Sequence, residues 1–385
     1  MTVRNITLRH LYLYAMLLFV VGGCDATSTS RQNERTAANT SAATETCDDV
    51  STSVPNLADS RFWAKTPDGK ILVTPDNFIR AESDTYMAAQ VVDGAFGRFK
   101  HTREVAPVDK QLIVRLNRDT IYSSAVFDLD AGPVTLTLPD SGGRFLSALT
   151  INEDHFNPHV WYSGGEYTLS RDDIGTRYVM VAIRILANPN DPDDLLKANA
   201  LQDKIAASQS GGPGTFDVPA WDPVSQKRVR NALIALSNTL PNLRYAAGPD
   251  IDSVDPVRRL IAAASGWGLN PDKDAVYLNV FPAQNDGKTP YRLTVGDVPV
   301  DAFWSVTVYT REGFFQPNKL NAYSVNSITG KKNNNGTITI QFGECEPDVP
   351  NCLPVTGGWN YMVRLYRPRQ EILDGSWQFP AAEPL

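Results

Sequence analysis

The chain has 385 residues, a formal net charge of −7, and hydrophobic residues at 42% of its positions. This composition is ordinary for a globular protein. The excess of acidic residues, together with the lack of a dense cluster of Lys and Arg, argues against a nucleic-acid-binding protein and against a polybasic membrane-surface protein.

The N-terminal residues have the three-part layout of a secretory signal. Arg4 and Arg9 precede an apolar run from Leu11 to Val21, and Gly22-Gly23-Cys24 follows. A transmembrane helix needs about 20 apolar residues. The shorter run therefore predicts a signal peptide over residues 1–23 and export of the protein.

The stretch Val21-Gly22-Gly23-Cys24 also resembles the bacterial lipobox, in which small residues precede a cysteine that receives a diacylglycerol. The resemblance implies a lipid at Cys24, a membrane as partner, and a location on the cell membrane facing the periplasm or the cell exterior. The alternative is an ordinary cleaved signal followed by a chance cysteine. Residues 24–60, which include Cys47, are rich in Ser, Thr, Ala and Asn, and this composition predicts a flexible tether.

Roughly 325 residues remain after the tether, more than one hydrophobic core usually organises, so two domains are expected. The first begins with a helix predicted over Pro75–Gln90, with Asp76 as its N-terminal cap and Gly94 and Gly97 beyond its end. From Leu112 onward, apolar alternations separated by turn residues predict the antiparallel strands Val134–Leu138, Phe145–Ile151 and Tyr178–Ile185.

A predicted helical insert separates these strands from a second group. Its helices are expected over Leu195–Ala207, along the apolar series Val229, Leu233, Leu236 and Leu240, and over Val257–Ala264. The second group comprises the strands Ala275–Phe281, Tyr291–Val295, Phe303–Tyr309, Thr337–Phe342 and Tyr361–Tyr366.

These elements predict an α+β protein that is mainly β, with two antiparallel β-sandwich or jelly-roll-like domains and a helical insert between them. The expected boundaries are a first domain over residues 61–210, a helical connector over 211–265 and a second domain over 266–385.

The two strand regions resemble each other in sequence. Asp119-Thr-Ile-Tyr122 matches Asp274-Ala-Val-Tyr277, and Phe145-Leu-Ser147 matches Phe303-Trp-Ser305 further along. We hypothesise that the halves arose by duplication, against the alternative of chance similarity between strand-and-turn sequences. Unrelated strand orders in the two halves would exclude the duplication.

The densest polar cluster opens the first strand region and is the predicted ligand-binding site. Arg115, Asn117 and Asp119 are expected on one face of a strand, with Arg118 and Tyr122 beside them. An arginine would bind a carboxylate or a sugar, and the other groups would orient it, so a small molecule is the expected partner. The alternative is an internal Arg–Asp pair that fixes the start of the sandwich.

A second cluster, Asn152-Glu-Asp-His-Phe-Asn-Pro-His159, supplies candidates for catalysis and metal binding. Pro158 excludes a regular helix with both histidines on one face, which argues against a metal site and favours a solvated loop. Neither a Gly-rich phosphate loop nor a Gly-x-Ser-x-Gly motif occurs, so no cofactor is expected. The acid–base candidates are Asp119, Glu153, Asp154 and His155, and the candidate metal ligands are His155 and His159.

Cys345 and Cys352 lie close together on either side of a Pro-containing loop. In an oxidising envelope compartment this pair predicts a disulfide. The alternative is a zinc site, but two thiolates without a nearby histidine or third cysteine are too few ligands for a closed structural site.

With these residues in view, the body resembles two bacterial families. The segments Arg115–Ser124 and Asp128–Pro133 resemble the signature of the domain of unknown function 1254, over about residues 76–205. Asn351–Pro354, Trp359–Pro368 and Leu373–Trp377 resemble its usual partner, the domain of unknown function 1214. The resemblance implies two paired domains without a general activity, although some relatives carry a carboxylesterase label.

Two functions are therefore carried forward. The first is an exported, lipid-anchored cell-envelope protein that binds a small polar or carbohydrate-like ligand near Arg115 and Tyr122. The second is a hydrolase, carboxylesterase-like or glycan-acting, that uses carboxylate and histidine groups. A cleft shared by Asp119 and His155 would favour the hydrolase, and an oligomer is compatible with either function.

Overall fold

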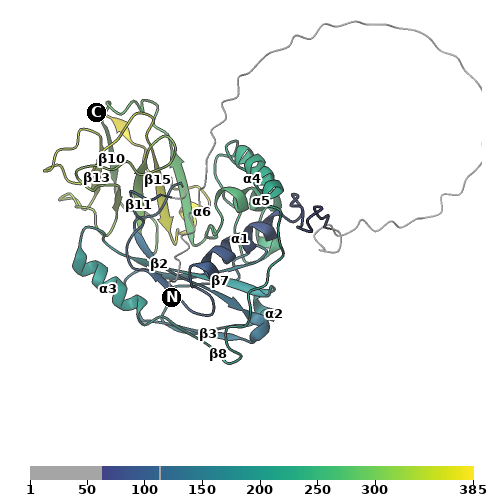
Figure 1. Ribbon diagram of the computed structural model, residues 1–385. Helices are drawn as coiled ribbons and strands as arrows, with labels where there is room; N and C mark the ends of the chain where they lie inside the picture. The colour runs from purple at the N-terminus through teal and green to yellow at the C-terminus, as the bar shows by residue number, and fades with distance from the viewer. Residues whose placement is uncertain (1–62, 112–113) are drawn as a thin grey trace, which may run out of the picture. The chain divides into compact units, whose positions relative to one another are not determined.

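The computed structural model describes residues 63–111 and 114–385 (Figure 1). The predicted signal peptide, the predicted tether, Cys24 and Cys47 lie outside these residues. The described residues belong to one compact unit. None of their helices is long and apolar enough to cross a membrane.

The first half is a sandwich of two antiparallel sheets. One sheet has the order β1-β2-β7-β4-β5 and the other the order β6-β3-β8. Alternate residues of β2 and β7, such as Phe127 and Ile183, are fully buried against Leu136 of β3, because successive strand residues point to opposite faces. The strands are β1 (Lys100–Thr102), β2 (Thr120–Asp128), β3 (Val134–Leu138), β4 (Leu146–Asn152), β5 (Val160–Trp161), β6 (Gly165–Leu169), β7 (Tyr178–Leu186) and β8 (Ala206–Gln209).

The second half is also a two-sheet sandwich, with the orders β12-β11-β15-β9 and β14-β13-β10-β16. Val306 and Val363 from the first of these sheets pack with Leu293 and Ile340 from the other. The strands are β9 (Ala275–Val280), β10 (Tyr291–Val295), β11 (Trp304–Tyr309), β12 (Ser324–Asn326), β13 (Ile338–Phe342), β14 (Cys352–Leu353), β15 (Asn360–Tyr366) and β16 (Glu383–Pro384).

The two halves share one strand order. β2-β7-β4-β5 corresponds to β9-β15-β11-β12, and β6-β3-β8 corresponds to β13-β10-β16, with antiparallel pairing throughout these sets. Only β1 and β14 among the described strands lack a counterpart. The duplication hypothesis therefore passes the test of strand order, and the predicted class, mainly β with two sandwiches, is confirmed.

A layer of three helices covers part of the first half. Phe78 of α1, Leu233 of α4 and Ile261 of α5 share one core, and α1 lies along the sheet of β2 and β7 (Figure 1), where Met87 packs against Val126. The helices are α1 (Phe78–Val92), α2 (Arg171–Ile174), α3 (Pro192–Gln202), α4 (Pro223–Ser237), α5 (Pro256–Ser265) and α6 (Gln370–Leu373), with short 3-10 turns at Leu129–Ala131 and Ile251–Ser253.

Some predicted details were wrong. α1 begins at Phe78 after Asn77, so Asp76 is not its cap. The helix predicted to reach Ala207 ends at Gln202, and Ala206 already belongs to β8, where pairing with β3 outweighs the local preference. The predicted disulfide between Cys345 and Cys352 is present, so these thiols are not zinc ligands.

Candidate functional site

Two arginines interrupt otherwise apolar central strands, and each has a tyrosine and a serine beside it. Arg184 of β7 lies across from Tyr122 of β2 and Ser147 of β4. We call these three residues the first row. The second row occupies the equivalent positions in the other half: Arg364 of β15 lies across from Tyr277 of β9 and Ser305 of β11.

Asn270 connects the two rows, and Asn117 connects the first row to Tyr366 of β15. Asn270 accepts a bond from Arg184 Nη1 at 3.3 Å and donates to the Tyr277 hydroxyl at 2.7 Å. Asn117 donates to the Tyr122 hydroxyl at 3.3 Å and to the Tyr366 hydroxyl at 2.9 Å. The rows therefore face one polar region between the two halves.

Arg364 is held by several neutral acceptors. It is 3% exposed and donates to Thr307 Oγ1 at 2.9 Å, to the Tyr309 hydroxyl at 2.7 Å and to the Arg115 carbonyl at 2.9 Å. A guanidinium has five N–H donors in a fixed fork. Since most of them have protein acceptors, Arg364 has a structural role.

Arg184 is less completely bonded. It is half-buried, and its acceptors in the described part of the chain are Asn270 and the Tyr122 hydroxyl. Its guanidinium carbon lies 5.5 Å from the centre of the Tyr122 ring. No acidic residue of the described chain forms an ion pair with Arg184, and this leaves guanidinium donors for another acceptor.

The pKa values of the two tyrosines in the rows are shifted in opposite directions. Burial is the largest effect at Tyr122 and raises its pKa, but Arg184, Thr120 and Arg364 together lower the pKa by more. Burial dominates at Tyr277 and raises its pKa. Both side chains are only half-buried, so solvent reaches part of each ring within this polar region.

Only some residues of the predicted ligand-binding cluster lie at the first row. Tyr122 belongs to it, and Asn117 is hydrogen-bonded to Tyr122. Arg115 donates to Asn360 Oδ1 at 2.7 Å, and its own carbonyl accepts from Arg364. Arg118 donates to the Ala106 carbonyl and lies over the rings of Phe315 and Tyr323, while Asp119 accepts from Ser324 at 2.8 Å and Asn326 at 3.3 Å.

The prediction that Arg115, Asn117 and Asp119 share one strand face was wrong. β2 begins only at Thr120. Arg115 has a φ of 55°, which ends any extended run, and Asn117 Oδ1 accepts the Asp119 backbone N–H at 2.8 Å in a tight local turn. The segment is a loop that fastens the first half to the second.

The acid–base candidates do not converge. β2 and β4 run in the same direction, and their first residues lie at the same edge of the sheet. Asp119 precedes β2 at that edge. His155 follows β4 at the opposite edge. Six strand residues separate the two ends, which corresponds to about 20 Å. Asp119 and His155 therefore cannot act in one cleft.

The second candidate cluster is engaged within the helical layer. Glu153 pairs with Arg80 at 3.3 Å and accepts the Tyr178 backbone N–H at 2.9 Å, and Asp154 pairs with Arg80 at 2.6 Å. His155 accepts from the Gly268 N–H at 2.9 Å. Burial lowers the pKa of His155 to about 3, so its imidazole is neutral at pH 7.

The other metal candidate lies apart from His155. His159 is paired with Asp173 at 2.7 Å on the surface. Among the described residues, no group of three or more His, Cys, Asp or Glu side chains could hold a metal ion.

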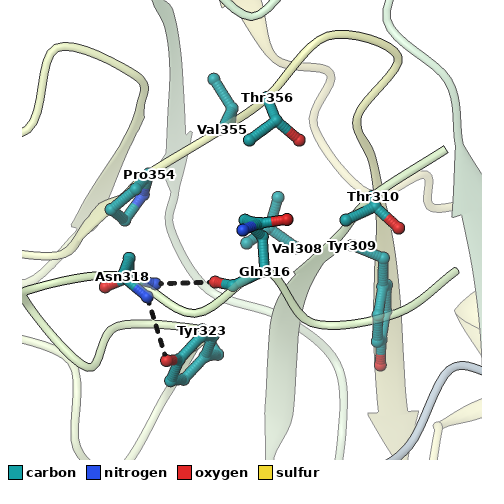
Figure 2. A pocket seen from close by; sticks show the side chains of 9 residues that line it. All are labelled: Val308, Tyr309, Thr310, Gln316, Asn318, Tyr323, Pro354, Val355 and Thr356. Atoms are coloured by element: carbon teal, nitrogen blue, oxygen red, sulfur yellow. Dashed lines mark hydrogen bonds between the residues drawn. The ribbon is translucent and has the colours of Figure 1, made fainter. Parts of the chain in front are cut away.

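Two hollows lie in the second half, away from the two rows. The first has a volume of about 10 Å³ and is lined by Tyr309, Asn318 and Tyr323 (Figure 2), which is room for one water molecule at most. The second, of about 410 Å³, lies beside the disulfide. Its charged side chains, Lys319, Glu344 and Glu346, are exposed.

The central residues of the rows were not predicted as site residues. The available signal was a single arginine inside each of two apolar strands, Tyr178–Leu186 and Asn360–Tyr366. A charged residue in such a strand is rarely buried without a partner, so Arg184 and Arg364 could have been chosen on that ground.

Comparison with solved structures shows the fold. The VPA0106 protein from Vibrio parahaemolyticus is 18% identical with a TM-score of 0.64, over 80% of this chain and 96% of that one. An uncharacterized protein from Burkholderia cenocepacia is 12% identical with a TM-score of 0.45, over 80% of this chain and 86% of that one. No curated protein matches the chain.

Two family models match the chain, and each match lies mostly within one of the two sandwiches. The protein of unknown function DUF1254 matches residues 96–209, from just before β1 to the end of β8. The protein of unknown function DUF1214 matches residues 279–370, from β9 to the start of α6. The chain therefore carries a DUF1254 domain followed by a DUF1214 domain, as its sequence motifs predicted.

Proposed function

We propose that this chain is an exported, lipid-anchored envelope protein that binds a small polar ligand through a carboxylate group, and that Arg184 is the anchor for that carboxylate. The observation that carries the proposal is the contrast in bonding between Arg184 and Arg364. Both lie in the same polar region, but Arg184 is half-buried and has two acceptors, at Asn270 and Tyr122.

A carboxylate is the anion that best matches this arrangement. The planar guanidinium fork forms two parallel hydrogen bonds with a carboxylate. A buried guanidinium needs acceptors for its N–H donors, and neither a described carboxylate nor a set of neutral acceptors like that of Arg364 surrounds Arg184. A ligand carboxylate would complete the pair.

The surrounding groups favour a hydroxylated acid such as a uronate or a hydroxy acid. Tyr122 and Tyr277 present phenol hydroxyls, and Asn117 and Asn270 present amides, all within the same hydrogen-bonded region. Such groups orient a polar ligand through its hydroxyls. The hydrolase alternative gains nothing from this geometry, since Asp119 and His155 lie at opposite ends of the sheet.

Titration calorimetry on the full chain tests the ligand proposal. The panel is galacturonate, glucuronate, malate and glucose, with Arg184→Met and the control variant Arg292→Met, whose side chain is exposed on β10. We expect at least one acid to bind and glucose not to bind. Hydrogen bonds to a charged group contribute about 1.5–3 kcal/mol, so Arg184→Met should weaken binding by about tenfold to a hundredfold. Equal affinity for Arg184→Met and the parent chain, or binding of none of these acids, would overturn the proposal.

The anchoring proposal has its own test. In a bacterial host, the parent chain should incorporate labelled fatty acid and sediment with membranes, because acyl chains hold a protein at the bilayer surface. Cys24→Ser should abolish both properties, while the control Cys47→Ser should change neither. Membrane association that survives Cys24→Ser would refute the lipid anchor.

A further inference from the structure

We infer that two copies of this chain pair through the free edge of β9 and form one antiparallel sheet across a two-fold axis. The inference concerns the assembly of the protein and does not depend on the proposed ligand. In the described part of the chain, β9 has one strand neighbour, β15, and no strand pairs with its other side.

The hydrogen bonds to β15 define which residues of β9 face the open side. Arg367, directly after β15, donates its N–H to the carbonyl of Asp274, directly before β9, at 2.9 Å. In an antiparallel pair, every second residue of a strand exchanges backbone hydrogen bonds with the neighbour, so Asp274 and alternate residues after it face β15. Tyr277, Asn279 and Phe281 therefore direct their N–H and C=O groups toward the open side.

The same side of the sheet is covered in the first half. Three residues of β2 are the counterparts, in order, of those three: Tyr122, Ser124 and Val126. β1 pairs with the first two, and the third exchanges backbone hydrogen bonds with Ala95 and Gly97 at 2.7 Å and 2.9 Å. Val126 is fully buried, whereas its counterpart Phe281 is 61% exposed. Since β1 has no counterpart among the described strands, the second half leaves this side open.

The β9 edge has none of the features that usually protect an edge strand. Natural edge strands carry charged residues, prolines or bulges that prevent pairing with another chain. β9 and Phe281 contain neither a charged residue nor a proline, and each residue of β9 pairs with one residue of β15, without a bulge. Phe281 precedes Pro282, a position that favours an extended backbone, so the edge continues as far as Phe281.

A second copy is the partner that this edge fits. Antiparallel pairing centred on Asn279 places the Asn279 side chains of the two copies opposite each other, and Tyr277 of each copy opposite Phe281 of the other. On the other face of the sheet, Leu278 lies opposite Val280. Aromatic and apolar cross-strand pairs stabilise a sheet, and two amides can each donate and accept. The strand is therefore complementary to itself in this register.

Pairing of this kind ends at a dimer. A two-fold axis uses the same edge on both copies, so the β9 edges of a dimer are both occupied. Interfaces below about 1,200 Å² belong to weak or transient complexes. Because two short strands form most of this interface, we expect association in the micromolar range.

Crosslinking in the full chain tests the pairing directly. Asn279→Cys in a Cys47→Ser background places two thiols opposite each other, with Cα atoms about 5.5 Å apart, within reach of a short bis-maleimide. We expect a crosslinked dimer from this variant and none from the control Thr294→Cys, an exposed strand position on β10. No more dimer than in the control would overturn the inference. Capture of a different protein would also overturn it, because a foreign strand would then occupy the edge.

Charge variants test the register. Asn279 is exposed, so its replacement leaves the fold intact. Asn279→Lys places two like charges opposite each other, which is costly at an interface, and we expect dimerisation to weaken by about tenfold or more. Asn279→Glu should have the same effect, whereas an equal mixture of the two variants should associate at least as tightly as the parent chain.

Sedimentation of the full chain in detergent micelles measures these variants, with Thr294→Lys as the control that should dimerise like the parent chain. An unchanged dimer in Asn279→Lys would contradict pairing through β9. A mixture of the Lys and Glu variants that stays monomeric would contradict the two-fold register centred on Asn279.

Discussion

Arg184 and Arg364 occupy equivalent positions in the central strands of the two halves, each between a tyrosine and a serine. Their surroundings are not equivalent. The loop at Arg115 and Leu116 supplies carbonyls that accept from Arg364, whereas the matching place beside Arg184 is taken by Asn270, which accepts only one bond, at 3.3 Å. The two sheets thus place an arginine at equivalent positions. The segments before β2 and β9 then give Arg364 several acceptors and give Arg184 few.

The two aspartates before β2 and β9 show the same principle in a reciprocal way. Asp119 of the first half accepts from Ser324 and Asn326 on β12 of the second half. Asp274 of the second half accepts from Tyr162, just after β5 of the first half, at 2.8 Å. Since β5 and β12 are equivalent strands, each half holds the other through the same pair of elements.

The largest difference between the halves is expected in the free energy of unfolding when Arg364 or Arg184 is replaced. Arg364→Met would leave the carbonyl of Arg115 and the hydroxyls of Thr307 and Tyr309 without their donor, and we expect a loss of about 3–5 kcal/mol in the free energy of unfolding. Arg184→Met removes a charge that has no acidic partner, and its cost should stay below about 1 kcal/mol. Urea denaturation of both variants measures the difference.

The control for this comparison is the shape of the transition. Equal denaturant slopes for the two variants and the parent chain would show that the same surface unfolds in each. If Arg184→Met proved as costly as Arg364→Met, the proposed division into a structural and an open arginine would be wrong.

The sheets of this fold could be predicted from sequence because apolar alternation is a local property. Val134–Leu138 and Tyr291–Val295 match β3 and β10 at both ends. The short strands β5 and β12 were missed because two or three residues carry too little periodic signal, and they form only by pairing with β4 and β11.

The site was predicted only in part for a related reason. Asn117 and Tyr122 lie in the dense polar segment that can be recognised from the sequence alone. Tyr122 belongs to the first row, and Asn117 donates a hydrogen bond to its hydroxyl. Arg184 and Asn270 lie far from that segment in the chain and come together only when the two halves meet. Sequence reasoning placed the remaining polar residues on a strand, and the positive φ of Arg115 prevented this.

A second difference should appear in how the free energy of unfolding depends on pH. Burial raises the pKa of Asp84 in the helical layer from 3.8 to about 7, and the pKa of this group in the unfolded chain is the ordinary one. A raised carboxyl pKa means that the folded state holds the proton, so its contribution to stability is present below pH 3.8 and is lost as pH rises through 7.

Asp84→Asn removes this titration and should leave the amide oxygen able to accept from Trp221, which donates to Asp84 at 2.8 Å. We expect the variant to be more stable than the parent by about 2 kcal/mol at pH 8 and equal to it at pH 4. Thermal unfolding at both pH values measures this. A constant difference between the two pH values would show that Asp84 does not titrate in this range.

The disulfide belongs to the second half alone. It joins the loop after β13 to β14, and β14 has no counterpart in the first half. Reduction should cost about 2 kcal/mol, because the bridge limits the unfolded chain over a short loop. Hydrogen exchange should accelerate at β13 and β14 and remain unchanged at the equivalent β6, and Cys345→Ser should reproduce the effect without reductant. Uniform acceleration across both halves would contradict a local role.

The smallest expected effect distinguishes the reciprocal aspartates. Asp119→Asn weakens a group that receives two hydrogen bonds and lies near the guanidinium of Arg364, and it should cost about 1 kcal/mol. Burial raises the pKa of Asp274, so its ionised form is disfavoured in the folded chain, and Asp274→Asn should gain a few tenths of a kcal/mol at pH 7 but nothing at pH 3. Denaturant titrations at the two pH values measure both variants. Equal losses for the two aspartates would mean that the halves hold each other symmetrically, and the asymmetry between the rows would then lie in the arginines alone.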